Sequence, residues 1–134
     1  FLIMSKIYQF KTKVYYEDTD AGGIVYYANY LKFIERARTE MIYQKIGLKL
    51  NQIKKEFNTI FVVKSCEINF LKAARFEDDL VIFTEILKKT PVRLNLSQII
   101  KRRSEIMVTS SIELAVVNER GLVQKLPEML YKKI

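Results

Sequence analysis

The spacing of apolar residues along the chain first follows a strand and then a helix. Apolar and polar residues alternate over Tyr8–Tyr16, which predicts a half-buried β-strand. Over Tyr27–Ile46 apolar residues recur every three or four positions, which predicts a long helix with Gly47 as its C′ residue. A short second helix is predicted over Leu50–Phe57.

Beyond the helices the pattern returns to strands. Consecutive strands joined by tight turns form an antiparallel meander, so the order strand, helix, strands predicts an α+β domain with one helix on one sheet face. We expect one domain over residues 1–134, in which Met4 is the natural start and residues 1–3 are a non-native or start-site extension. The predicted later strands are Ile60–Leu71, Leu80–Lys89, Val92–Lys101 and Ile106–Asn118, with a short one over Leu122–Lys125.

The absence of histidine from the sequence excludes several kinds of catalytic site. No imidazole base, Ser-His-Asp triad or histidine-ligated zinc can form, and we expect no metal site. Catalysis must therefore use carboxylates, hydroxyls, lysines or backbone amides. Cys66 is the single cysteine, so no disulfide forms within the chain; we expect a cytoplasmic protein and a buried Cys66 in its strand.

The charge of the chain bears on its partners. Lys and Arg number 23 against 15 Asp and Glu, a net charge of +8, which attracts phosphate groups or simply aids solubility. The basic residues are scattered and lack an aromatic-interleaved motif, so we expect no nucleic-acid partner. No apolar run approaches the roughly 18 residues of a membrane span, so no membrane insertion is expected.

The junction between the first strand and the long helix, YYEDTDAGGIVYYANY over Tyr15–Tyr30, holds more chemistry than a turn requires. Read singly, its residues are structural: Asp18 or Asp20 caps a turn, Thr19 bonds locally, and the glycine pair supplies positive φ. Read together, an acid precedes two glycines that open the way to unpaired N–H groups at a helix start. An acid beside an oxyanion-binding amide suits acyl transfer to water, with Asp20, which we expect to be buried, as general base or nucleophile.

The segment VYYEDTDAGGIVYYANYLKFIERARTEM closely resembles the signature of hotdog-fold acyl-CoA thioesterases. The nearest group is the Tol–Pal-associated (YbgC-type) family, related to 4-hydroxybenzoyl-CoA thioesterase. FVVKSCEINFLKAARFEDDL resembles that family's second strand and following turn. The resemblance implies a hotdog fold, in which a curved antiparallel sheet of five to six strands wraps a long central helix.

The resemblance also implies roles for individual residues. Asp20 matches the catalytic carboxylate, and the backbone N–H near Tyr27 would polarise the thioester carbonyl of a short-chain or aromatic acyl-CoA, with no further cofactor. Many Tol–Pal-associated members carry histidine where this chain has Tyr27. The other implied positions are Asp18 and Thr19 as supports of the loop, and Gly22, Gly23, Val25, Lys72, Arg75 and Arg93 as contacts to the substrate.

The same resemblance implies a homodimer or homotetramer that completes the site. Hotdog dehydratases use a histidine, so the sequence excludes that activity. The alternative is a non-catalytic hotdog module that binds acyl carrier protein or another acidic partner. The positive charge favours this alternative and the acid before the glycine pair opposes it, so a thioester hydrolysis assay separates the two.

Overall fold

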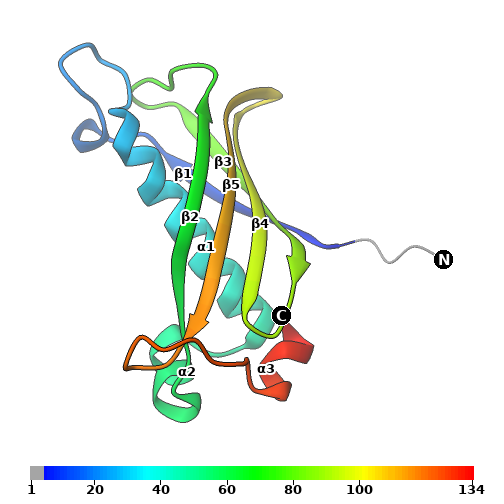
Figure 1. Cartoon of the computed structure of the whole chain (residues 1–134). Coiled ribbons are helices and arrows are strands. Elements are labelled where there is room, and N and C mark those ends of the chain that lie inside the picture. The colour runs from blue at the N-terminus through cyan, green and yellow to red at the C-terminus, as the bar shows by residue number, and fades with distance from the viewer. Residues whose placement is uncertain (1–4) are drawn as a thin grey trace.

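A computed structural model describes residues 5–134, and the expected extension over residues 1–3 lies outside them. A long helix lies against a five-stranded sheet, and two short helices lie at one end of the molecule (Figure 1). The elements are β1 (Ile7–Lys13), two 3₁₀ turns η1 (Tyr16–Asp18) and η2 (Tyr27–Asn29), α1 (Tyr30–Ile46), α2 (Leu50–Phe57), β2 (Ile60–Phe70), β3 (Asp79–Lys89), β4 (Arg93–Arg102), β5 (Glu105–Val117) and α3 (Glu128–Lys133).

The sheet is antiparallel throughout, and its strand order is β1-β3-β4-β5-β2. The predicted meander is therefore correct for β3, β4 and β5 only. The prediction was wrong for β2, which pairs with β5 rather than β3. Residues 71–78, which join β2 to β3, are too long for a hairpin turn. They cross the end of the sheet from the β2 edge, past β5 and β4, to the internal strand β3.

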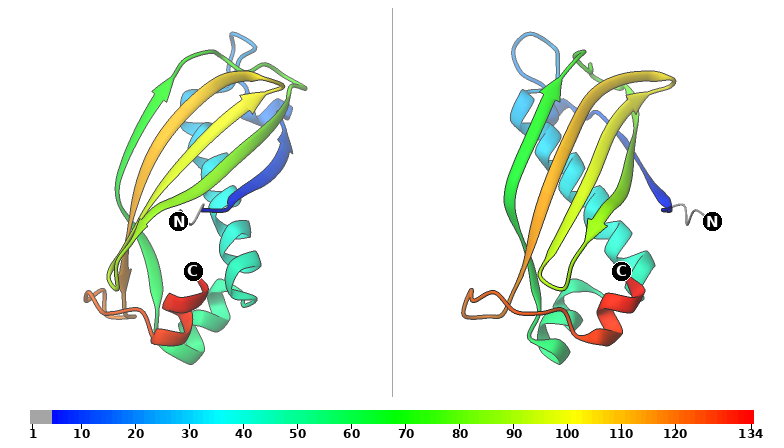
Figure 2. Two further views of the ribbon diagram at one scale, coloured as in Figure 1. Left: turned by 90° about the vertical axis from the view of Figure 1, so that its right-hand side faces the viewer. Right: turned by 45° about the vertical axis from the view of Figure 1, so that its right-hand side comes forward.

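The sheet curls around α1, which lies along its concave face (Figure 2). Phe33, Ile34 and Met41 of the helix are fully buried against it, together with inward-facing residues such as Leu96 and Ile100 of β4. The predicted long helix is thus confirmed, and its first turn is the 3₁₀ turn η2. Gly47 ends α1 at φ 79°, a left-handed conformation that favours glycine, and its N–H donates to the Tyr43 carbonyl.

Two predicted strand segments differ in the structure. The first strand ends at Lys13 because the Asp18 carboxylate accepts the Tyr15 N–H at 2.9 Å, which closes the turn η1. The short strand expected near residue 123 is reduced to one bridge between Val117 and Val123. Among residues 5–134, no helix is long and apolar enough to span a membrane.

The two edges of the sheet differ in chemistry. β1 exposes Lys11 and Lys13 at one edge, and charged residues there disfavour pairing with a further strand. β2 forms the other edge and exposes Val62 and Val63. Cys66 is also exposed, so the prediction that it is buried was wrong; a strand at the sheet edge has no neighbour to cover it.

Candidate active site

The predicted site loop, Thr19–Val25, is a small hairpin that projects beyond the sheet (Figure 1). Thr19 and Val25 form a bridge at its base, and inside it the Asp20 N–H donates to the Ile24 carbonyl at 2.9 Å. Thr19 Oγ1 donates to the Tyr16 carbonyl at 2.7 Å. These bonds give the loop one conformation without burying its tip.

Asp20 and the glycine pair form the tip of this loop. The Gly22 N–H donates to Asp20 Oδ1 at 2.8 Å, and a Cβ on Gly22 would meet that oxygen at 3.2 Å. Gly23 adopts φ 79°, which favours glycine. Asp20 is exposed, so the expectation of a buried acid was wrong for this chain alone: the hairpin lifts its carboxylate into solvent. The buried acid is Asp18, at 6% exposure.

The start of the long helix supplies unpaired backbone donors. Within residues 5–134 the Tyr27 N–H has no hydrogen-bond acceptor, because it opens η2 and the Ile24 carbonyl, three residues earlier, accepts the Asp20 N–H instead. The first turn of a helix also carries partial positive charge. The Tyr27 ring is 62% exposed and packs edge-on to Phe70, with ring centroids 5.9 Å apart. Within the part of the chain that the structure describes, the Tyr27 N–H is therefore a free donor at a helix start, a group that a ligand carbonyl can satisfy.

Two residues without a predicted role hold the helix start in place. Asn29 is buried, and its Nδ2 donates to the Asp18 carbonyl at 2.9 Å, which also accepts the Tyr26 N–H. Tyr30 Oη accepts the Ala74 N–H at 3.0 Å, and burial raises the pKa of this phenol. The sequence did offer one sign of a role for Asn29: it is a polar amide among the apolar positions of the predicted helix.

A pocket of about 230 Å³ lies beside the helix start, between α1 and the end of β2. It contains three of the predicted site residues, Val25, Tyr27 and Lys72, while Asp20 and the glycines lie outside its lining. Its remaining walls are apolar or aromatic, which suits the acyl part of a thioester. The full lining is Ile24, Val25, Tyr27, Tyr30, Phe70, Leu71, Lys72 and Ala73.

The predicted phosphate-binding cations fall into two groups. Lys72 lines the pocket, and exposed Arg75 pairs through its backbone with Ile24 of the site loop. Arg93 begins β4, about 30 Å of extended strand from Arg102 at the other end, and its Nη1 donates to the adjacent Val92 carbonyl. The structure thus brings Lys72 and Arg75 to the loop and leaves Arg93 at the opposite end of the sheet.

Comparison with known proteins places this arrangement in a family. A model of the thioesterase superfamily matches residues 22–109, which include the glycine pair, α1 and most of the sheet but begin after Asp20. Acyl-CoA thioesterase YbgC of Haemophilus influenzae is 35% identical over 111 residues, covering 83% of this chain and 81% of that protein. Acyl-CoA thioester hydrolase YbgC of Escherichia coli O157:H7 is 35% identical over 132 residues, covering 96% and 92%.

A solved structure agrees with these relatives. The crystal structure of a probable thioesterase from Bartonella henselae superposes with a TM-score of 0.86 at 34% identity, covering 91% of this chain and 100% of that one. The α1 helix and five-stranded sheet are thus the hotdog fold that the sequence predicted. The chain therefore belongs to the thioesterase superfamily, and the prediction of a hotdog-fold thioesterase is confirmed.

Proposed function

We propose that this chain hydrolyses a short-chain or aromatic acyl-CoA to the free acid and coenzyme A. The observation that carries the proposal is the unpaired Tyr27 N–H, which opens a helix beside an apolar pocket. Asp20 is the single acid of the adjoining hairpin, and the YbgC relatives are named as acyl-CoA thioesterases. A cytoplasmic location, expected from the lone cysteine, belongs to the same proposal.

In the proposed reaction the thioester carbonyl oxygen accepts the Tyr27 N–H, and the helix start stabilises the negative charge that develops there. As general base, Asp20 takes a proton from water, the water oxygen adds to the carbonyl carbon, and the C–S bond breaks. The coenzyme A thiolate leaves and takes up a proton. As nucleophile, Asp20 instead adds to the carbonyl carbon and the C–S bond breaks, which releases the coenzyme A thiolate and leaves a mixed anhydride. Water then hydrolyses the anhydride to the free acid and restores the Asp20 carboxylate.

The basic side chains near the loop fit the coenzyme A part of the substrate. Lys72 lines the pocket and Arg75 forms a backbone bridge with the site loop, which supports a role for both in binding the phosphates of the nucleotide. Arg93 keeps its predicted role only if a second copy brings it to the site. An acyl carrier protein carries its acyl group on the same phosphopantetheine thioester. Acyl-carrier-protein thioesters are therefore alternative substrates and should be assayed beside acyl-CoA.

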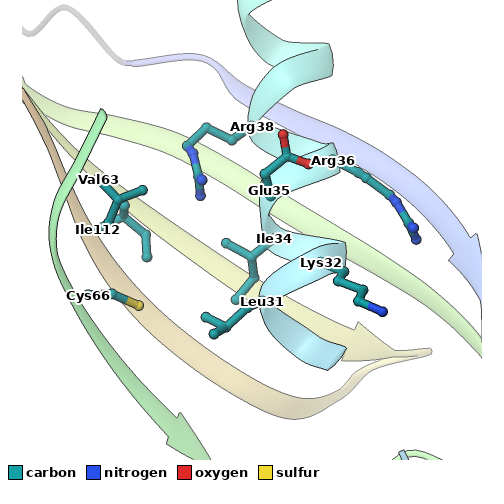
Figure 3. A pocket seen from close by; sticks show the side chains of 9 residues that line it. All are labelled: Leu31, Lys32, Ile34, Glu35, Arg36, Arg38, Val63, Cys66 and Ile112. Carbon is teal, nitrogen blue, oxygen red and sulfur yellow. The ribbon is translucent and has the colours of Figure 1, made fainter. Parts of the chain in front are cut away.

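We infer further that two copies pair along β2, as a homodimer or as the unit of a homotetramer. A groove of about 460 Å³ runs between α1 and this free edge, with Leu31, Ile34, Val63 and Ile112 among its walls (Figure 3). Apolar surface beside an unpaired strand is what a second copy would cover.

The charges in this groove also favour a second copy. The Arg38 guanidinium reaches toward Val63 and Ile112 (Figure 3), and burial lowers its pKa. It donates to Gln98 Oε1 at 3.0 Å, and no acid within residues 5–134 forms a salt bridge with it. Glu35 stands exposed at the rim, and in a two-fold interface Glu35 of each copy can pair with Arg38 of the other.

The assembly is tested by placing one charge on each sheet edge. Val63→Lys should dissociate the assembly, because it buries a lysine in the apolar contact. Gln9→Lys, on exposed β1, should leave the mass unchanged. Light scattering at micromolar concentration measures both, and a wild-type monomer that retains full activity would refute the pairing.

Hydrolysis is tested with the two acids of the junction. Asp20→Asn keeps the shape but removes basicity and nucleophilicity, so turnover should fall by roughly 10²–10⁴-fold. Because Asp20 is exposed, its loss should leave the melting temperature unchanged. Asp18→Asn should instead cost modest activity and about 1 kcal/mol of stability, because its buried carboxylate accepts the Tyr15 N–H.

The assay uses pure protein with a panel of acyl-CoA and acyl-carrier-protein thioesters. Near-normal turnover of Asp20→Asn together with loss in Asp18→Asn would overturn the assignment of the acid. Wild-type protein that binds the thioesters without hydrolysing any of them would favour the non-catalytic binding module instead.

A further inference from the structure

The segment between β2 and β3, residues 71–78, holds the site loop from one side. The Val25 N–H donates to the Ala74 carbonyl at 2.9 Å, and Ile24 forms a bridge with Arg75. Ala74 also donates its N–H to Tyr30 Oη at the helix start. The hairpin that carries Asp20 and the helix start are therefore both hydrogen-bonded to this segment, which lies outside the sheet.

Asp78 fixes the far end of that segment. Its Oδ2 accepts the Arg75 N–H at 2.8 Å, and the Asp78 N–H donates back to the Arg75 carbonyl at 3.0 Å. The same Oδ2 accepts Arg102 Nη1 at 2.7 Å. One carboxylate oxygen thus joins the backbone that borders the site loop to a guanidinium on the last residue of β4.

Arg102 also reaches the near end of the segment. Its Nη2 donates to Glu105 Oε1 at 2.6 Å, and Glu105 is hydrogen-bonded in turn to Lys72 Nζ. The side chains of Arg102, Asp78 and Glu105 are 30%, 22% and 35% exposed, so solvent screens their charges only partly. A planar guanidinium presents two donors in a fixed fork, which a lysine does not.

We propose that Arg102 is a positioning residue for the proposed thioesterase site, holding the segment 71–78 at Lys72 and at Asp78 so that the hairpin and helix start keep their productive geometry. The proposal rests on the proposed function. Among residues 5–134, the hydrogen bonds of Arg102 reach the pocket lining only through Glu105 and Lys72, so its proposed effect on the site is indirect. A displacement of about 1 Å at a site can cost roughly 10²-fold in rate, so loss of the hydrogen bonds from Arg102 should have a measurable effect on turnover.

The first experiment compares Arg102→Gln and Arg102→Lys with a matched control, Lys13→Gln. Lys13 forms an exposed pair with Asp79 at 3.8 Å, next to the same segment but unconnected to the site loop. Arg102→Gln should lower kcat for a short acyl-CoA by roughly ten- to a hundredfold. Arg102→Lys should lower it less, KM should change by less than about threefold, and Lys13→Gln should match wild type.

A double mutant separates positioning from general stability. If Arg102 acts through the loop that carries Asp20, Arg102→Gln should cost much less activity in an Asp20→Asn background than in wild type. Full additivity of the two losses would overturn the proposal. So would an unchanged kcat in Arg102→Gln, whatever its melting temperature.

Hydrogen exchange keeps the test independent of turnover. In Arg102→Gln the Val25 amide, which is bonded to Ala74, should exchange at least about tenfold faster than in Lys13→Gln, while Leu96 in the core of β4 stays unchanged. Equal acceleration at Val25 and Leu96 indicates global destabilisation and overturns positioning. If wild type hydrolyses no thioester, the proposed function has failed, and exchange at Val25 alone decides whether Arg102 positions the loop.

Discussion

The proposed carbonyl-polarising group is a backbone N–H, so the sharpest perturbation removes that hydrogen while keeping the helix. Tyr27→Pro does this, because proline has no N–H and is favoured at the first position of a helix. The residue before a proline must be extended, and Tyr26 already has φ −62° and ψ 127°. The lost N–H has no acceptor within residues 5–134, so the folded chain loses no backbone bond.

The matched control is Tyr27→Ala, which removes the same ring from Phe70 but keeps the N–H. Removing one oxyanion donor costs about 10²–10³ in kcat, roughly 2.7–4 kcal/mol, and we expect that factor between the proline and alanine variants. Their free energies of unfolding should agree within about 1 kcal/mol, because both lose the same aromatic contact. Steady-state hydrolysis of a short acyl-CoA and urea melts measure both quantities. Equal kcat in the two variants would show that the Tyr27 N–H is not the donor.

Two further predictions concern charge. If coenzyme A phosphates meet Arg75, then Arg75→Ala and added salt should each raise KM several-fold at nearly constant kcat, whereas Arg93→Ala should change KM only if a second copy brings it to the site. Hydrogen bonds from Lys72 and then Arg102 lower the pKa of the Glu105 carboxyl below its usual 4.5. The interactions that lower this pKa stabilise the fold above pH 4.5, and this stabilisation is lost as the pH falls through the folded-state pKa. Urea melts of wild type and Glu105→Gln should therefore differ at pH 7 and converge as the pH falls below 4.5. Constant separation across that range would exclude ionised Glu105 as the source.

The elements of the fold were predictable because each depends on local spacing. The long helix, Leu50–Phe57 and the strand positions follow from periodicity, and Gly47 ends its helix as expected. The place of β2 beside β5 was not predictable in this way, because strand neighbours depend on where a connection crosses the sheet. The exposure of Cys66 follows from that placement, so the two errors have one cause.

The features of the site also fall into those that depend on local sequence and those that depend on contacts between distant segments. The acid, the glycine pair and the helix start are contiguous in sequence, so a pattern over residues 15–30 predicts them together. The clamp by Arg102 joins three segments distant in the chain, and a lone arginine in a basic sequence gives no sign of it. Asp20 is likewise exposed because the hairpin projects beyond the sheet, and the residue types of the hairpin do not predict that projection.

The departure from the resembling family at Tyr27 has a physical explanation in this geometry. Tyr27 contributes its N–H to the proposed site through the backbone, while its ring is mostly exposed and leans on Phe70 at the pocket rim. Among residues 5–134 the Tyr27 side chain forms no hydrogen bond, so a change from histidine to tyrosine leaves the backbone donor in place. Asn29, Asp18 and the Val25–Ala74 bond hold that backbone. Under the proposed mechanism the exchange should therefore alter which acyl groups fit the rim, while hydrolysis should still require the N–H and Asp20.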